Sequence, residues 1–359
     1  MKLLQILYPG LGGHSSVAFS LIEGDAKAFF SHQLLGYGIE KPSESYIAKC
    51  QEYNITPFYV LKKIGFDLTS LWRSYRKLKE INPDYIIMHS TSLILIVWLY
   101  SLLNGKKFIS VEHQPNQIKT KTDWVYTLLI TFFSPKVIYL TQIYGKEIQK
   151  KSIFFFNKKK TVVINNGINV SKFRPFLKKS ENADKLVISM IARIMNTKDQ
   201  KTLIDAFSEI TIESPTVMYL AGDGTMKNEL EKYVKQLRLE DKIIFTGTIN
   251  ENDVISLIQN TDIYVHSSLG ETLSTSILQI MACKVPIIAT DIPGINNLLT
   301  HDSEALLFEP KNKEELVNCI KRLINDKELA KYLANNAYEK LIKNYSCIKM
   351  FERYKNCFN

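Results

Sequence analysis

Two cations stand five residues apart in segment 192–207, "ARIMNTKDQKTLIDAF", and their types suit the binding of an anion. Arg193 ends an apolar, strand-like run, and Lys198 is followed by Asp199 and Thr202 at the start of a helical pattern. A guanidinium gives forked hydrogen bonds, an ammonium adds a point charge, and the helix dipole adds to both. A diphosphate would suit this pattern, although two surface cations with no common ligand are equally compatible with it.

A lone carboxylate precedes an apolar helical run in "GETLSTSILQIMACK", residues 270–284. Backbone N–H groups at the start of a helix lack partners within the helix and can bind phosphate oxygens. Because a carboxylate would repel phosphate, we expect Glu271 to accept hydrogen bonds from neutral hydroxyls, such as those of a sugar. Gln279, near the second helical turn, can both donate and accept. The alternative for Gln279 is a polar residue on a half-exposed helix.

Glycines follow two of the strand-like runs. Gly12 and Gly13 belong to "YPGLGGHSS", residues 8–16, and Gly222 stands beside Asp223 in "YLAGDGTM". Glycine lets the backbone turn tightly or approach a ligand closely. The first segment lacks the G-x-G-x-x-G spacing of dinucleotide enzymes, so it is a weak signal for a ligand loop. The second favours a turn, with cleft lining as the alternative.

Two histidines end apolar runs, His89 in "IIMHS" and His113 in "ISVEHQP". The carboxyl ends of strands in α/β folds are where ligand-binding side chains gather. A buried structural histidine is the competing interpretation of each.

Strand-like apolar runs alternate with helical patterns along the chain, which predicts βαβ units and mostly parallel sheets. About ten strands would crowd one open sheet, so two domains fit better, divided near the polar segment 169–185. The predicted fold is α/β, with two Rossmann-like doubly wound domains facing a central cleft that is the expected binding site. The predicted strands lie in 3–9, 85–90, 107–113, 136–141, 161–167, 186–193, 216–222, 242–247, 262–267 and 285–290, and the clearest helices in 70–81, 200–210, 226–237, 252–260 and 313–326.

Composition narrows the class of protein. The 359 residues, 45% hydrophobic and 23% charged, suit a globular protein of two domains. Five scattered cysteines without a CxxC pair argue against a disulfide scaffold or a zinc site and fit a reducing cytosol. No signal peptide is evident at the start. The apolar stretch 93–103 is shorter than the roughly 20 residues of a membrane span, so we predict a buried helix there.

The net excess of positive charge lies entirely in the first half of the chain. Residues 1–175 carry 23 Lys and Arg against 11 Asp and Glu, a net charge of +12, whereas residues 176–359 carry 23 against 25, a net charge of −2, and the sum is +10. A basic face attracts phosphate-rich partners such as anionic lipid, lipid-linked phosphate or nucleic acid. Charge that serves only solubility is the alternative.

In their order along the chain, these segments resemble the family 4 retaining glycosyltransferases (glycosyl transferases group 1), enzymes of the GT-B fold. The resemblance covers nearly the whole chain and is weak between residues 29 and 81. The motifs that carry it are "PGLGG", "EH" at 112–113, "VVINNGINVSKF", "ARIMNTKD", "AGDG", "FTG" and "LGETLSTSILQIMACKVPIIATDIPG".

The resemblance implies a catalytic set. Arg193 and Lys198 would bind the donor diphosphate and stabilise its charge as it leaves. Glu271 would hold hydroxyls of the donor sugar, and His113 would lie near the transferred sugar or the acceptor. The family needs no metal, because the two cations replace it, and no cofactor, because the nucleotide sugar is a substrate. The implied donor-binding residues are Gly12, Gly13, Gly222, Thr272, Leu273, Ser274, Thr275 and Gln279.

The sequence departs from the family pattern at several positions. Gln279 stands where the family usually has a second Glu that binds the ribose of the nucleotide, and an amide would bind a ribose diol less strongly. Thr272, Leu273 and Ser274 replace the usual G-F-G or G-F-P, and Lys284 replaces a common Gly. Because Arg193 and the other catalytic matches are intact, we expect an active enzyme.

The predicted protein is a cytoplasmic, metal-independent retaining hexosyltransferase. It would move a sugar from a nucleotide diphosphate donor, with a UDP-sugar favoured, to a nascent glycan or lipid-linked acceptor in surface polysaccharide or glycolipid synthesis. The alternatives are a nucleotide-sugar 2-epimerase of the same fold and a basic nucleic-acid-binding protein. The epimerase would need an extra cluster of acids and His that the sequence does not offer. No nucleic-acid motif is recognisable, so no nucleic-acid partner is expected.

The expected domains are an acceptor-side domain over 1–175, a nucleotide-sugar-binding domain over 176–340, and a C-terminal helix over 341–359 that packs back on the first domain. The basic first domain predicts peripheral association with the anionic inner face of the cell membrane. The run 150–160, "KKSIFFFNKKK", mixes aromatics with cations as interfacial segments do, or is a helix packed inward with solvated ends. The other candidate membrane contacts are Lys62, Lys63, Arg73, Arg76, Lys77, Lys79, Lys106 and Lys107.

Overall fold

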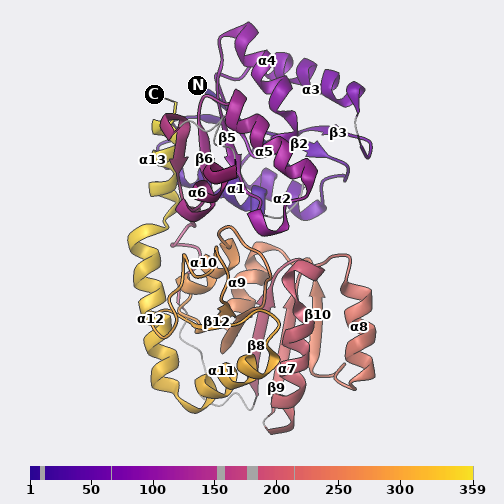
Figure 1. The fold of residues 1–359 in the computed structure, drawn as a ribbon, viewed down its shortest axis with the longest axis vertical. Helices are drawn as coiled ribbons and strands as arrows, with labels where there is room; N and C mark the ends of the chain where they lie inside the picture. The colour runs from indigo at the N-terminus through magenta and orange to yellow at the C-terminus, as the bar shows by residue number, and fades with distance from the viewer. Residues whose placement is uncertain (9–12, 66, 152–157, 176–184, 214, 359) are drawn as a thin grey trace. The chain divides into compact units, whose positions relative to one another are not determined.

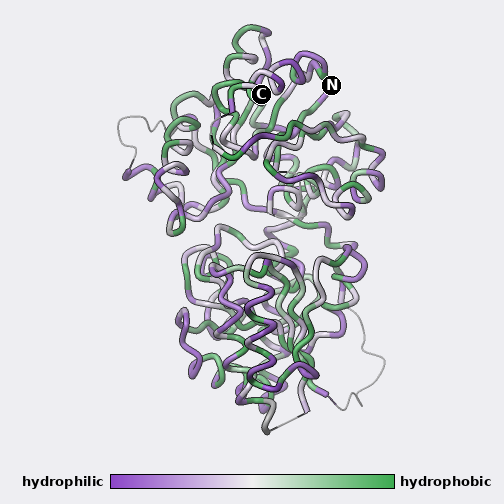
Figure 2. Tube along the Cα trace, turned by 90° about the vertical axis from the view of Figure 1, so that its right-hand side faces the viewer, coloured by the Kyte–Doolittle hydropathy of each residue, from purple (hydrophilic) through white to green (hydrophobic). Residues whose placement is uncertain are grey.

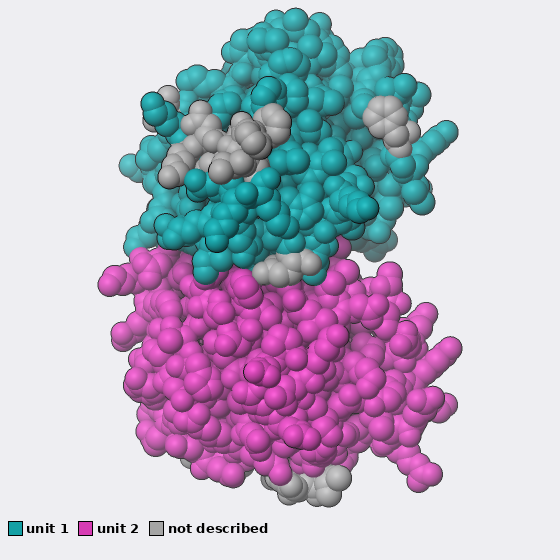
Figure 3. Space-filling model, viewed as in Figure 1, with its two compact units in different colours: residues 1–169, 346–359 teal, residues 170–345 magenta. Residues whose placement is uncertain are grey.

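The chain forms two compact units, each with its own parallel sheet. The computed structural model describes residues 1–359 except 9–12, 66, 152–157, 176–184, 214 and 359. Unit 1 comprises residues 1–169 with 346–359, and unit 2 comprises residues 170–345 (Figure 3). Within the described ranges, none of the helices combines the length and apolar composition that a membrane span needs.

The described part of unit 1 holds a seven-stranded sheet in the order β3-β2-β1-β4-β5-β6-β7, with every neighbouring pair parallel (Figure 1). Near-continuous apolar strands of this kind suit a sheet covered on both faces. The strands are β1 (Lys2–Leu7), β2 (Ser31–Gly38), β3 (Phe58–Leu61), β4 (Tyr85–Met88), β5 (Lys107–Glu112), β6 (Val137–Tyr139) and β7 (Thr161–Val163).

Helices cover both faces of this sheet. Successive side chains of a strand point to opposite faces, so the apolar strands need helices on both sides. Ile6 of β1 packs in the core beneath α3, α4 and α5, whereas Leu7 belongs to the core formed with α1 and α2. Helix α13 packs against α1. The helices of unit 1 are α1 (Gly13–Gly24), α2 (Glu44–Glu52), α3 (Leu68–Ile81), α4 (Ile94–Asn104), α5 (Lys121–Phe133), α6 (Gln142–Lys151) and α13 (Cys347–Asn356).

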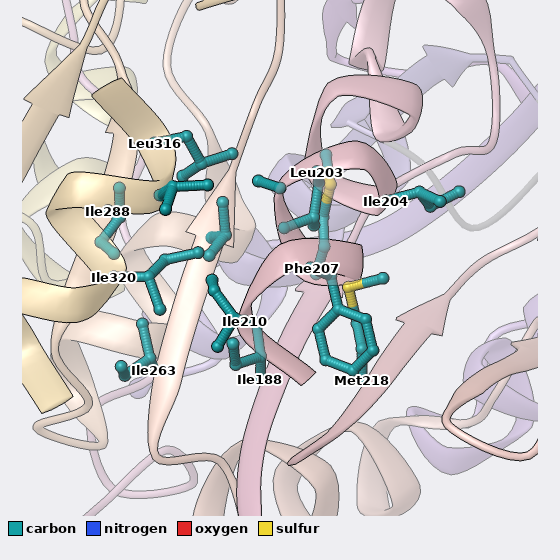
Figure 4. Packing of buried hydrophobic residues seen from close by; sticks show 14 of the residues in the cluster. Ile188, Leu203, Ile204, Phe207, Ile210, Met218, Ile263, Ile288, Leu316 and Ile320 are labelled. Atoms are coloured by element: carbon teal, nitrogen blue, oxygen red, sulfur yellow. The ribbon is translucent and has the colours of Figure 1, made fainter. Parts of the chain in front are cut away.

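In unit 2 the described residues form a parallel six-stranded sheet in the order β10-β9-β8-β11-β12-β13. Phe207 of α7 and Met218 of β9 belong to its buried core, which α11 also lines through Ile320 (Figure 4). The elements are β8 (Leu186–Ile191), α7 (Gln200–Glu213), β9 (Thr216–Ala221), α8 (Lys227–Gln236), β10 (Ile243–Gly247), α9 (Glu251–Gln259), β11 (Ile263–His266), α10 (Thr275–Ala282), β12 (Ile287–Thr290), β13 (Leu306–Phe308), α11 (Lys313–Asn325) and α12 (Lys327–Asn344).

Both sheets reverse their direction of winding at one point. The chain runs outward from β1 to β3 and then returns to place β4 on the other side of β1. Unit 2 repeats this arrangement with β8 and β11 as the central neighbours. The loops at the carboxyl ends of two such strands diverge, which opens the crevice where doubly wound sheets bind ligands.

All ten predicted strands and the five predicted helices are confirmed, with shifts at their ends. The sequence analysis missed β2, β3 and β13. The last two are only four and three residues long, and β2 contains polar residues and glycines that blur its pattern. Along the helices, hydrophilic and hydrophobic colours alternate as expected for helices buried on one side (Figure 2).

Two predictions need correction. Residues 341–359 are not one helix, because α12 ends at Asn344 and Ser346 caps α13, its side chain accepting a hydrogen bond from the backbone N–H of Lys349. Helix α4, predicted to be buried, buries only one face, which includes Val97 and Tyr100. Leu102 on its other side is 66% exposed. Both faces of α4 are apolar, so its pattern does not tell which one packs on the sheet.

Candidate active site

Lys198, His266 and Glu271 meet at the switch point of unit 2. β8 and β11 are paired neighbours, with Ile263 opposite Ile188. Lys198 follows β8 at the end of a 3-10 turn, His266 is the last residue of β11, and Glu271 lies in the loop before α10. Side chains from two distant parts of the chain therefore share one end of the sheet.

One oxygen of Glu271 accepts from two partners. Its Oε1 forms a short ion pair with Nζ of Lys198 and lies 2.8 Å from Nε2 of His266. The Glu271 side chain is only 12% exposed. Burial would raise the pKa of Glu271, but the Lys198 ammonium and the His266 hydrogen bond outweigh it and hold this pKa at about 2. Glu271 is therefore an ionised hydrogen-bond acceptor at neutral pH, which is the form that can accept from neutral hydroxyls.

A second hydrogen bond orients the imidazole. Burial lowers the pKa of His266, although Glu271 opposes this, so the ring is neutral at pH 7. A neutral imidazole has one N–H, and the negative Glu271 draws it to Nε2. Nδ1 is then the acceptor for the Tyr264 hydroxyl, 3.1 Å away. The sequence analysis missed His266, although it ends an apolar strand as His89 and His113 do.

Hydrogen bonds join the loop after β11 to the loop after β8. The Ser267 hydroxyl donates to the carbonyl oxygen of Lys198 at 3.1 Å. The Ser268 hydroxyl and the backbone N–H of Leu269 both donate to the carbonyl oxygen of Thr197, at 3.1 and 2.8 Å. The backbone on which Lys198 is mounted is therefore fixed relative to the loop that carries its carboxylate partner.

Two glycines allow close backbone packing beside these loops. Gly294 has a φ of +101°, and an added Cβ would lie 2.1 Å from the carbonyl oxygen of Glu271. Gly222 has a φ of +141°, and its Cβ would lie 2.1 Å from the carbonyl oxygen of Ala192, next to Arg193. The turn interpretation of Gly222 therefore has a direct steric reason, while its donor-binding role stays a prediction.

Arg193 is placed differently from Lys198. It follows β8 by two residues, is exposed, and its carbonyl oxygen accepts from the side chain of Gln200 at 2.8 Å. Over the described part of the chain, no ion pair involves its guanidinium. The structure thus joins Lys198 to Glu271 and leaves Arg193 as a solvated cation at the same end of the same strand.

Helix α10 starts where the sequence analysis placed it. Ser274 is its N-cap and accepts from the backbone N–H of Ile277 at 3.4 Å. Thr272, Leu273 and Ser274 are buried, and Thr275 is the first helical residue. Gln279 is half-buried in the second turn of the helix. Nothing in this geometry decides between its two interpretations, so a ribose contact stays a prediction.

Three histidines gather at the switch point of unit 1. His89 follows β4, His113 follows β5, and His14 lies in the first turn of α1. Nδ1 of His89 lies 2.8 Å from Nε2 of His113, and the ring centroids of His14 and His113 are 4.5 Å apart. Burial lowers the pKa of His89 to about 3 and that of His113 well below its ordinary value, and the neighbouring histidines act in the same direction. Both rings are neutral at pH 7.

A buried amide fixes which nitrogen of each ring carries its proton. Nε2 of Gln5 donates to the carbonyl oxygen of Ala18 at 3.3 Å, so its Oε1 faces Nε2 of His89 at 3.1 Å. An oxygen only accepts, so the proton of His89 is on Nε2 and its Nδ1 accepts from Nε2–H of His113. Nδ1 is therefore the basic nitrogen of His113. No motif or spacing in the sequence points to Gln5.

Glu112, the other member of the "EH" pair, anchors its own loop. One oxygen accepts from the Thr127 hydroxyl at 2.7 Å and pairs with Nζ of Lys119 at 3.1 Å. The other accepts from the backbone N–H of Gln114 at 3.0 Å. These bonds shape the segment that follows His113, so Glu112 is a positioning residue.

The structure describes only part of the glycine segment after β1. Gly12 lies outside the described residues, so its predicted contact is untested. Gly13 is the exposed first residue of α1, and a Cβ there would meet nothing within 4 Å. In the described ranges, no three His, Cys, Asp or Glu side chains are arranged to hold a metal ion.

Sequence models of two families match consecutive parts of the chain. The Glycosyltransferase Family 4 model matches residues 11–172, and the Glycosyl transferases group 1 model matches residues 173–340. Together they extend over both sheets except β1, over all three histidines and over the Lys198–Glu271 pair.

Characterised and uncharacterised relatives agree with this match. The chain is 24% identical over 310 residues to UDP-Gal:alpha-D-GlcNAc-diphosphoundecaprenol alpha-1,3-galactosyltransferase of Escherichia coli, covering 81% of this chain and 79% of that protein. It is 26% identical over 354 residues to an uncharacterized glycosyltransferase of Haemophilus influenzae, covering 96% and 95%.

Solved structures share the fold at lower identity. HepE of Anabaena in complex with UDP and glucose has a TM-score of 0.82 at 19% identity, covering 99% of this chain and 98% of that one. Sucrose-phosphate synthase of Thermosynechococcus elongatus has a TM-score of 0.80 at 16% identity, covering 100% and 99%. With the family matches, these similarities confirm the sequence prediction: the chain belongs to the family 4 glycosyltransferases, and its fold is GT-B.

Proposed function

We propose that the protein is a retaining glycosyltransferase that moves a sugar from a UDP-sugar to a nascent glycan or lipid-linked acceptor. The observation that carries the proposal is the group at the switch point of unit 2. There Glu271 is held ionised between Lys198 and His266, and Arg193 follows the same strand as Lys198. This group offers a carboxylate for sugar hydroxyls and cations for phosphate.

The donor and the acceptor class are supported by relatives. HepE was solved with UDP and with UDP-glucose. The name of the Escherichia coli relative states a UDP-Gal donor and a diphosphoundecaprenol-linked acceptor. A lipid-linked acceptor also agrees with the net charge of +12 on residues 1–175, because both the diphosphate linker and an anionic membrane attract cations.

The chain's own residues have defined tasks in this reaction. The bond between the anomeric carbon and the donor phosphate oxygen breaks, and a bond from that carbon to the acceptor oxygen forms on the same face. The acceptor proton goes to the departing phosphate oxygen. Arg193 and Lys198 stabilise the negative charge that develops on the diphosphate, as preorganised cations do, without a metal ion. Glu271 orients the sugar, and His113 contributes its basic Nδ1 to sugar or acceptor binding.

Arg193 gives the sharpest test, because it has a proposed catalytic task and forms no ion pair with the residues that the structure describes. Arg193→Met is expected to reduce kcat by about 10²–10³-fold, the usual effect of removing one preorganised charge-stabilising group, while the melting temperature stays within a degree or two. Lys232→Met, an exposed lysine of α8, is the matched control and should keep full activity. An Arg193→Met enzyme that transfers at the normal rate would refute the proposed role of this residue.

The donor and the reaction type are tested separately. Thermal shift against UDP, GDP and ADP and their sugars identifies the nucleotide, because a bound ligand stabilises the folded state. Incubation of the donor alone distinguishes transfer from 2-epimerisation, since only an epimerase alters the sugar while it is still on the nucleotide. NMR of the product then gives the anomeric configuration, and inversion would contradict a retaining mechanism.

A further inference from the structure

Helix α4 presents an apolar face that nothing in the described chain covers. Leu95, Leu99, Leu102 and Leu103 are spaced at i, i+4, i+7 and i+8, so they lie on one side of the helix. Leu102 and Leu103 are 66% and 63% exposed, and the other two are also exposed. The opposite side, with Val97 at its centre, packs on the sheet. Four neighbouring exposed leucines on one helix are more than the scattered apolar residues of an ordinary surface.

Helix α3 extends this surface. It packs beside α4, as Figure 1 also shows. Leu68 and Trp72, four residues apart, are 68% and 59% exposed, whereas Ser70 and Ser74 on the other side of the helix are buried. We call these six side chains the apolar ridge: Leu68, Trp72, Leu95, Leu99, Leu102 and Leu103.

The ridge is bordered by positive charge. Residues 62–80 contain six Lys and Arg and two acidic residues, Asp67 and Glu80, of which Glu80 pairs with Lys77 at 2.6 Å. Asp67 caps α3 by accepting from the backbone N–H of Ser70. The guanidinium of Arg76 lies 4.8 Å from the centre of the Trp72 ring, and exposed Lys79 follows one turn later. Apolar and cationic side chains thus occupy adjoining parts of one helix layer.

We propose that the apolar ridge docks on the surface of a bilayer that contains anionic lipid. A bilayer surface offers an acyl boundary for leucine and tryptophan and negative head groups for the flanking cations. A second copy of the chain fits less well, because a symmetric contact would bring the two basic α3 helices together. At 11 residues, α4 lies in the plane of the membrane instead of crossing it. The proposal goes beyond the proposed function and rests on it only for the lipid-linked class of acceptor.

Vesicle binding tests the ridge without any glycosyl transfer. The full chain is sedimented with vesicles of phosphatidylcholine alone and with vesicles that also contain one quarter phosphatidylglycerol. We expect clear binding to the anionic vesicles, weaker binding to the neutral ones, and partial release by salt. Vesicles made with brominated lipid should quench the fluorescence of Trp72, and Trp72→Phe should remove most of this quenching because Trp98 and Trp124 are less exposed.

Two sets of variants separate the apolar and the cationic contributions. Arg76→Glu with Lys79→Glu should weaken binding to anionic vesicles by at least about 30-fold, since each cation near such a surface contributes roughly fivefold. Its control, Lys232→Glu with Lys235→Glu, makes the same charge change on exposed positions of α8 and should bind normally.

The apolar set is the triple variant Leu99→Ser, Leu102→Ser, Leu103→Ser. It should weaken binding to both kinds of vesicle by at least about tenfold, because less apolar area is buried at the interface. Ile342→Ser with Ile348→Ser replaces exposed apolar residues of α12 and α13 and serves as its control. All of these positions are exposed, so folding is expected to be retained, and circular dichroism checks it.

Three outcomes would overturn the proposal: wild type that ignores anionic vesicles, ridge variants that bind like wild type, or a wild-type dimer that the leucine variants dissociate in sedimentation velocity. The last outcome would assign the ridge to a contact between copies. Transfer to a water-soluble acceptor is measured in parallel. A chain that binds vesicles through the ridge but transfers no sugar would refute the proposed function and leave the ridge intact.

Discussion

Replacement of Lys198 by methionine tests whether the buried carboxylate of unit 2 depends on its cation. Methionine keeps an unbranched apolar chain one atom shorter than that of lysine, and it leaves Glu271 with only its other hydrogen bonds. The Lys198 side chain is 19% exposed and that of Glu271 is 12% exposed, so water replaces little of the lost attraction. Breaking a buried pair by removing one partner typically costs 3–5 kcal/mol of unfolding free energy.

The pKa of Glu271 gives an independent value for the same quantity. A carboxyl whose pKa is lowered from 4.5 to about 2 by folding contributes about 3 kcal/mol to stability at neutral pH. Because the folded-state pKa is the lower one, this stability is fully present above about pH 4.5 and is lost as the pH falls toward 2. In Lys198→Met, burial remains and raises the pKa of Glu271, so the cost of the substitution is greatest at pH 7 and shrinks in acid.

Urea-induced unfolding of the intact chain between pH 7 and pH 4 measures both effects. Adding Glu271→Gln to Lys198→Met should restore most of the loss at pH 7, because the buried charge is then gone. Lys201→Met is the matched control. Lys201 is 57% exposed and pairs with Asp205 one turn away, so its removal should cost no more than about 0.5 kcal/mol. A Lys198→Met cost as small as that of the control, or one that does not vary with pH, would refute the reasoning.

Three further predictions concern other parts of the site. Gln5→Leu removes the acceptor that fixes the tautomers of His89 and His113. ¹⁵N NMR should then show His113 as a mixture of tautomers instead of one with its proton on Nε2, and an unchanged spectrum would contradict the proposed role of Gln5. The pKa of His89 is about 3 in the folded protein and near 6.5 in the unfolded chain. The contribution of His89 to the free energy of unfolding is therefore complete above pH 6.5 and should fall by about 2 kcal/mol by pH 5. A His89→Asn variant whose free energy of unfolding falls with pH as steeply as that of wild type would contradict this. Gly294→Ala should cost more than about 2 kcal/mol in urea unfolding, because its Cβ would overlap a carbonyl oxygen at a positive φ, and a smaller loss would mean that the loop shifts easily.

Local patterns in the sequence were enough to identify the elements that carry the chemistry. Alternation of strands and helices predicted two doubly wound domains, because apolar runs and amphipathic periods are short-range properties. Arg193, Lys198 and Glu271 stood out because their motifs lie within single strand–loop–helix segments. The missed β3 and β13 were too short for any period to appear.

The partners of those residues were decided by tertiary structure. Lys198 and Glu271 are 73 residues apart in sequence and meet because β8 and β11 are neighbours at the switch point, an order that no local pattern contains. The same holds for Gln5 and His89, whose strands β1 and β4 flank the other switch point.

The sequence also did not show which face of an apolar helix is buried. Helix α4 is apolar on all sides, so only packing showed that Val97 faces the sheet while Leu102 faces solvent. The sequence by itself determined the family, the two parallel sheets and the residue types at the carboxyl ends of their strands. Tertiary structure alone decided the strand order. It thereby also decided the proton positions and pKa values at the site, because these depend on burial and on neighbours that are distant in sequence.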